Sequence, residues 1–88
     1  ALGQCFEKEI MVHNTRPTLA TAASLHLCAG ITNAARVQEY SGTRLDMGLA
    51  PLFQNGLDFK DGFLSVPTGP GLGLAVNKPA MLKGRLNR

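Results

Sequence analysis

Two ionisable side chains stand at the ends of two short β-forming stretches of the sequence. His13 closes a run of strand-forming residues, and Glu39 lies near the end of a second run. An imidazole changes protonation near neutral pH and can take or return a proton. The pair therefore predicts proton-transfer chemistry on one bound molecule, with Asn14 and Arg16 as candidate substrate contacts directly after the imidazole.

Each of these residues also has a purely structural interpretation. His13 could bond a loop carbonyl at the end of a strand, and Glu39 could be a solvated carboxylate. Asn14 and Arg16 could order the loop in which they lie. His26 falls in the middle of a predicted helix, and we interpret it as a packed or rim histidine.

The two cysteines bear on both metal binding and redox compartment. Cys5 and Cys28 form neither a CxxC pair nor a disulfide framework. With His13 and His26 they would supply the ligand types for zinc, but His26 and Cys28 are two residues apart on a predicted helix and point away from each other. Two free thiols suit a reducing compartment, so we expect a cytoplasmic location.

Three elements position the ionisable pair. The pattern predicts a strand over Glu9–His13, a helix over Thr18–Cys28 and a strand over Arg36–Tyr40. The helix is apolar nearly all round, which indicates burial, and Gly30 fits the position just after its end. A strand–helix–strand unit usually has parallel strands, so the carboxyl ends that carry His13 and Glu39 should lie side by side.

The second half of the chain predicts a β-hairpin. Asp61-Gly62 suits a type I′ turn, which would pair Phe59 with Leu64. The same register would pair Leu57 with Val66 and place all four apolar side chains on one face.

The remaining segments have weaker patterns. Gly69, Gly71 and Gly73 lack the spacing of a phosphate-binding loop, and we interpret them as part of a rigid Pro/Gly loop. Asn77–Lys83 predicts a short helix capped by Asn77. Residues 1–8 are compatible with the end of a helix that stops near Gly3.

Charge and hydropathy exclude two kinds of partner. The net charge is +3, and no acidic residue follows Asp61. The basic residues of this tail are sparse and lack interleaved aromatic residues, so we expect a solvated terminus and no nucleic acid. No segment is long and apolar enough to cross a bilayer, so we expect no membrane partner.

Three stretches of the sequence resemble those of a known family. The series "VHN", "PTLATAASLHLCAGITNAARVQEY" and "DGFLSVPTGPGLGLAV" lies between Glu9 and Val76. It resembles the C-terminal part of the enolase superfamily, and more narrowly the mandelate racemase branch with its sugar-acid dehydratases. The glycine-rich stretch and the interval between His13 and Glu39 carry the resemblance together.

The resemblance implies an α/β fold, the C-terminal part of a modified (β/α)8 TIM-type barrel followed by a hairpin segment of a capping α+β domain. Residues 1–42 would be the end of the barrel, and residues 43–88 the capping-domain segment and tail. His13 would end the seventh strand as general base or acid. Glu39 would end the eighth strand and, carrying a proton, donate a hydrogen bond to the substrate carboxylate. Met11 and Val37 would fill the barrel interior beneath them.

The resemblance also implies a cofactor and a partner. Reactions of this superfamily begin with removal of the proton α to a carboxylate, and one Mg²⁺ stabilises the enediolate. The carboxylate ligands of that ion lie on earlier strands, so this chain should contain no metal ligand.

An 88-residue chain holds two barrel strands at most. We therefore expect a fragment that needs the remainder of the barrel and does not catalyse alone. The complete enzyme is expected to form a homo-oligomer, a state that the sequence does not fix.

Within the family, the "VHN" and "PTLATAASLHL" motifs favour a hydro-lyase that dehydrates an acid sugar (an aldonate). Two alternatives stay open: a racemase or epimerase of the same superfamily, and a non-catalytic fragment that folds only with a partner. The sequence does not fix the stereochemistry of the substrate.

Overall fold

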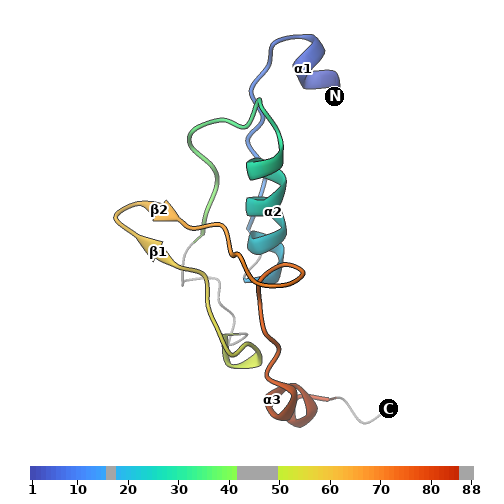
Figure 1. The fold of residues 1–88 in the computed structure, drawn as a ribbon, viewed down its shortest axis with the longest axis vertical. Coiled ribbons are helices and arrows are strands. Elements are labelled where there is room, and N and C mark those ends of the chain that lie inside the picture. Colours follow the sequence, from blue (N-terminus) through green and yellow to red (C-terminus); the bar gives the residue numbers. More distant parts are fainter. Residues whose placement is uncertain (16–17, 42–49, 86–88) are drawn as a thin grey trace.

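Helix α2 (Leu19–Gly30) is the longest element, and the other segments are arranged along it (Figure 1). The computed structural model describes residues 1–15, 18–41 and 50–85. Helices α1 and α3 lie at opposite ends of the molecule, and a β-hairpin projects to one side. The other elements, in chain order, are α1 (Leu2–Cys5), the 3-10 helix η2 (Ala50–Leu52), β1 (Phe59–Lys60), β2 (Phe63–Leu64) and α3 (Lys78–Lys83).

Helix α2 follows from its many alanine and leucine residues, which lose little conformational freedom in a helix. Thr18 occupies the N-cap position as predicted, but its side chain makes no capping hydrogen bond. The helix continues two residues beyond the predicted end at Cys28. Gly30 is its last residue, so its predicted place after the helix end is wrong. The chain leaves the helix directly into extended backbone at Ile31 (φ −113°, ψ 143°), which needs no left-handed residue.

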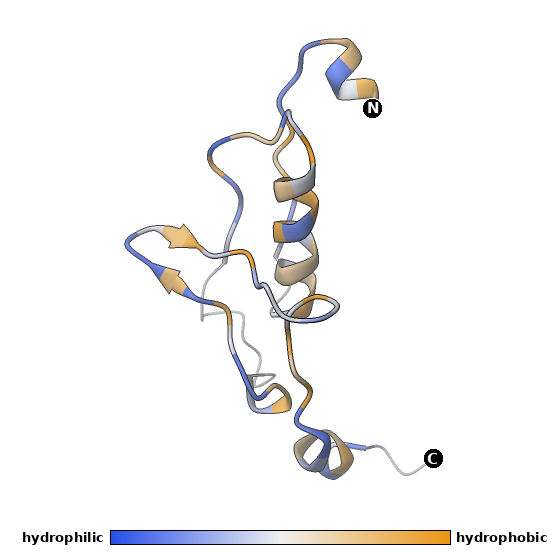
Figure 2. Ribbon diagram, in the orientation of Figure 1, coloured by the Kyte–Doolittle hydropathy of each residue, from blue (hydrophilic) through white to orange (hydrophobic). Residues whose placement is uncertain are grey.

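The predicted burial of α2 on all sides is wrong for this chain. Its buried residues are Thr21 and Ala22 alone, whereas Leu19 and Leu27 are each 52% exposed. Figure 2 shows that apolar residues nevertheless extend along most of the helix. The described segments cover one side of α2 and leave the other side open.

The segments before and after α2 run parallel, as predicted. Ile10 and Ala34 form a parallel bridge, in which Ile10 N–H donates to Asn33 (2.8 Å) and Ala35 N–H donates to the Ile10 carbonyl (2.9 Å). Backbone pairing between these segments is confined to this bridge. The strands predicted over Glu9–His13 and Arg36–Tyr40 are therefore wrong in extent, and the second is also wrong in position.

The side chain of Gln38 takes the place of the missing backbone ladder. Its Oε1 accepts from the Val12 N–H (2.9 Å), and its Nε2 donates to the carbonyls of Ile10 (3.1 Å) and Ala35 (2.8 Å). Buried or half-buried backbone groups need such partners. One amide thus fastens the segment before α2 to the segment after it.

The hairpin is confirmed in its turn and its first pair. Phe59 pairs with Leu64 in the antiparallel ladder of β1 and β2. Asp61 (φ 51°) and Gly62 (φ 84°) both have positive φ, which a type I′ turn requires. The ladder contains two residue pairs and ends before the predicted pair of Leu57 with Val66.

The Pro/Gly segment after the hairpin forms a tight loop, as predicted. Gly73 is buried and has a φ of 75°, and its N–H donates to the Pro70 carbonyl (3.1 Å). A Cβ atom at this position would collide with Pro67. Asn55 anchors the loop, because its Nδ2 donates to the Gly73 carbonyl (2.8 Å) and its Oδ1 accepts from Ala75 N–H (2.7 Å).

The two terminal helices are short. The prediction for α3 is confirmed in substance: Asn77 is its N-cap and accepts a hydrogen bond from Ala80 N–H, and Pro79 lies in the first turn. Helix α1 continues past Gly3 to Cys5, so the predicted stop near Gly3 is wrong.

The chain exposes much surface for its size. Its accessible surface is 7050 Å², whereas a compact protein of 9.4 kDa has about 5,000 Å². Ala22 is the one hydrophobic residue that is buried among those described. None of the described helices combines the length and apolar character needed to cross a membrane.

Replacing Gly73 with alanine should destabilise the protein by about 2–4 kcal/mol, because a left-handed backbone and the Pro67 ring both oppose a Cβ. Gly30→Ala is the matched control, since a Cβ there meets nothing within 4 Å. It should stabilise by about 0.5–1 kcal/mol through helix propensity. Urea denaturation measures both, and equal effects of the same sign would contradict the prediction.

Replacing Gln38 with alanine should lower the free energy of unfolding by about 1–3 kcal/mol, since three backbone groups lose their partner. The control is Gln4→Ala, which removes one exposed bond to Thr32 and should change stability by less than about 0.5 kcal/mol. Similar losses for the two variants would show that Gln38 does not join the segments.

Candidate active site

His13 and Glu39 lie in direct contact. Nδ1 of His13 is 2.8 Å from Oε2 of Glu39. The side chains are 83% and 36% exposed, respectively, so the imidazole is open to solvent while the carboxylate is partly covered. The parallel course of the two flanking segments brings together residues that are far apart in the sequence. The predicted juxtaposition is therefore present in this chain.

The contact defines which ring nitrogen is available for chemistry. A neutral imidazole that donates from Nδ1 to a carboxylate has its lone pair on Nε2. The arrangement can thus accept a proton at Nε2.

Asn14 holds Glu39 from the other side. Its backbone N–H donates to the same Oε2 atom (2.7 Å). Its side chain turns toward α2, where Nδ2 donates to Thr21 Oγ1 (2.9 Å). Both Asn14 (5%) and Thr21 (3%) are almost wholly buried. A direct role of Asn14 in substrate binding stays a prediction, and Arg16 lies outside the described residues.

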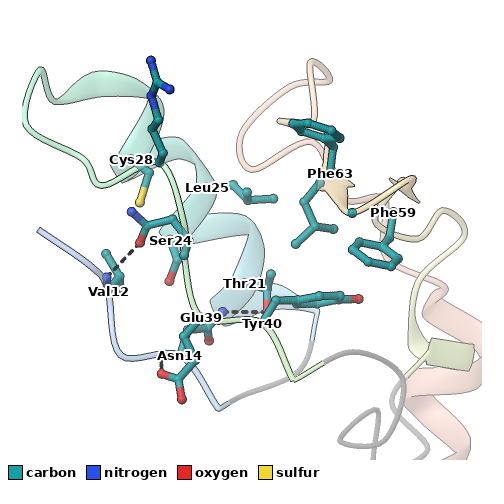
Figure 3. Close-up of a pocket in the computed structure, with 14 residues that line it drawn as sticks. Val12, Asn14, Thr21, Ser24, Leu25, Cys28, Glu39, Tyr40, Phe59 and Phe63 are labelled. Atoms are coloured by element: carbon teal, nitrogen blue, oxygen red, sulfur yellow. Dashed lines mark hydrogen bonds between the residues drawn. The ribbon is translucent and has the colours of Figure 1, made fainter.

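A hollow of about 200 Å³ opens beside this pair on the helix side. Figure 3 shows Leu25 of α2 and Phe63 of the hairpin on opposite sides of it. Val12 and Asn14 line it and His13 does not, because successive residues of an extended chain point to opposite sides. The full lining is Val12, Asn14, Thr21, Ser24, Leu25, Cys28, Arg36, Gln38, Glu39, Tyr40, Phe59, Gly62, Phe63 and Leu64.

The two aromatic rings of Tyr40 and Phe59 connect the site to the hairpin. Their centroids are 5.3 Å apart and their planes are inclined by 41°, a favourable arrangement for aromatic side chains. The residue that follows Glu39 is thereby packed against β1. This contact limits how far the end of that segment can move.

His26 has a structural contact, in keeping with its interpretation as a packed or rim residue. It is half-buried, and its Nε2–H donates to the Leu72 carbonyl at 3.3 Å. This bond joins α2 to the Pro/Gly loop. Both cysteines are free thiols. Within residues 1–15, 18–41 and 50–85, no three side chains of His, Cys, Asp or Glu are grouped closely enough to hold a metal ion.

Sequence reasoning gave no role to Gln38 and Thr21. A signal for Gln38 exists, because an amide on the helix-facing side of a β-forming stretch must find hydrogen-bond partners when it is covered. Thr21 offered no comparable signal. A threonine in the first turn of an alanine-rich helix is unremarkable until a buried amide is placed beside it.

Comparison with known proteins gives one family. The chain matches the family described as enolase C-terminal domain-like over residues 1–80. The search of curated proteins gives no match, and neither does the search of solved structures.

Proposed function

Because the chain belongs to the enolase C-terminal domain-like family, we propose that it is the C-terminal part of a Mg²⁺-dependent sugar-acid dehydratase. Membership places it in the enolase superfamily, whose enzymes catalyse reactions that begin with proton abstraction. The narrower assignment to a hydro-lyase acting on an acid sugar rests on the sequence motifs around His13 and α2. The observation that carries the proposal is the 2.8 Å contact between the His13 imidazole and the Glu39 carboxylate.

His13 is proposed as the residue that moves the proton. Its Nε2 takes the proton α to the substrate carboxylate, and the C–H electron pair enters the enediolate. The imidazolium then returns the proton to the β-hydroxyl, which departs as water as the carbon–carbon double bond forms. The exposure of this side chain leaves room for a substrate above the ring.

Glu39 is proposed to hold the substrate carboxylate. To donate a hydrogen bond to an anion, this carboxyl group must carry a proton. In this structure its Oε2 accepts from the Asn14 N–H and faces His13.

The proposal includes Mg²⁺ with ligands from outside the described residues, among which no suitable group of side chains exists. This chain contributes the proton-transfer pair.

The remainder of the barrel is proposed as the partner that completes the fold. Met11 and Val37 are 61% and 76% exposed. The flanks of α2 are also open. Neighbouring strands and helices would cover these surfaces, with residues 1–42 in the barrel and residues 43–88 in the capping segment. We further propose a cytoplasmic, homo-oligomeric enzyme without nucleic-acid or membrane partners.

A non-catalytic role is the second candidate, and the small buried core favours it for the chain alone. One buried hydrophobic residue in the described part does not make a stable domain. Enzyme activity distinguishes the two roles, because a non-catalytic fragment would show none even when its partner is bound.

In the full-length enzyme, His13→Ala should lower kcat by about 10²–10⁴-fold, because the proton acceptor is lost. Stability should change little, since the side chain is 83% exposed. Glu39→Gln should lower kcat less, because an amide can still donate to the substrate and accept from Asn14. His26→Gln is the control and should retain activity. A folded His13→Ala enzyme with a near-normal rate would defeat the assignment.

Incubation of the full-length protein with Mg²⁺ and a panel of acid sugars should yield 2-keto-3-deoxy acids. NMR of the products identifies them and also detects deuterium at the α-carbon in D₂O. Exchange at that carbon without loss of water would favour the racemase or epimerase alternative. Neither reaction across the panel, with the protein folded, would favour the non-catalytic role.

A further inference from the structure

We propose that Asn14 and Thr21 form a buried clamp that positions the His13–Glu39 pair. The inference rests on the proposed function for its kinetic consequences, but its structural part stands on the contacts of this chain alone. Neither residue is assigned a chemical step. They act through the carboxylate and the imidazole that they hold.

Burial is the first argument. Asn14 is 5% exposed and Thr21 is 3% exposed, which makes them the two buried polar residues of the described chain. Burying a polar side chain is unfavourable unless it is hydrogen-bonded. The bond from Asn14 Nδ2 to Thr21 Oγ1 (2.9 Å) meets that requirement and ties the chain after His13 to the first turn of α2.

The second argument is the path from the clamp to the reacting groups. Asn14 is the neighbour of His13 in the chain, and its backbone N–H donates to Glu39 Oε2 (2.7 Å). That oxygen is the atom that faces His13 Nδ1 (2.8 Å). Fixing the Asn14 side chain therefore fixes both the N–H that holds the carboxylate and the backbone that carries the imidazole.

The third argument concerns the alternative role of Asn14. Asn14 lines the hollow on the helix side, but it is 5% exposed and its amide is bonded to Thr21 of α2, so it presents little surface on the open side where His13 lies. His13, beside it, is open to solvent. The structure thus favours the loop-ordering role of Asn14 over direct substrate contact.

The test uses Thr21 variants of the full-length protein. Thr21→Ala removes the hydroxyl and favours the helix, and Thr21→Val removes it while keeping the side-chain volume. Thr21→Ser restores the hydroxyl.

Thr68→Ala is the matched control, because Thr68 is exposed in the Pro/Gly loop. Circular dichroism identifies variants that are folded, and the readouts are kcat, KM and ¹⁵N NMR of labelled histidine, with His13 assigned by its loss in His13→Gln.

Loss of the clamp should lower kcat about ten- to a hundredfold with little change in KM, the cost of a small misplacement of reacting groups. The neutral His13 ring should also shift from the Nδ1–H form toward the Nε2–H form. Thr21→Ser should restore both readouts, and Thr68→Ala should alter neither. This result supports the clamp.

Other results separate the clamp from the proposed function. Folded Thr21→Ala protein with unchanged kcat and unchanged His13 signals would overturn the clamp, as would a rise in KM alone. If the unmodified protein shows no dehydration but Thr21→Ala still changes the His13 signals, the clamp stands and the dehydratase proposal fails.

Discussion

The parallel pairing of the segments on either side of α2 is the constraint on which the rest of the structure depends. Backbone hydrogen bonds supply it only around the bridge of Ile10 with Ala34. Beyond that bridge, the side chains of Gln38 and Glu39 form hydrogen bonds to the backbone of residues 10–14. A side-chain amide and a carboxylate thus hold the two segments together where a β-ladder would otherwise do so. As a result, Glu39 ends in contact with His13 and not in solvent.

The site has two sides with different character. On one side are His13 and the exposed Met11 and Val37, which the proposed barrel would cover. On the other side are α2, the hollow and the buried bond between Asn14 and Thr21. The His13–Glu39 pair, to which we assign proton transfer and substrate binding, therefore lies between an open face and a supporting face made by a helix. Functional groups held by rigid elements in this way keep their geometry better than groups held by a loop alone.

The second half of the chain fixes the position of the first. The hairpin contacts the site segment through the rings of Tyr40 and Phe59. The Pro/Gly loop reaches α2 through the bond between His26 and the Leu72 carbonyl. These contacts are few, in keeping with the large accessible surface of the chain. They join two parts that the proposed function assigns to a barrel and to a capping segment.

The sequence by itself determined the elements whose signals are local. Asp61-Gly62 dictates a turn with positive φ at both positions, Asn77 caps α3, and the alanine-rich stretch forms α2, because each of these depends on residues close in the chain. It also identified His13 and Glu39 as a pair. Only the tertiary structure decided how they are held, since Gln38 and Glu39 bond to backbone groups about 25 residues away and Asn14 bonds across the loop to Thr21. Strand extent and burial likewise failed as predictions, because both depend on what a segment packs against.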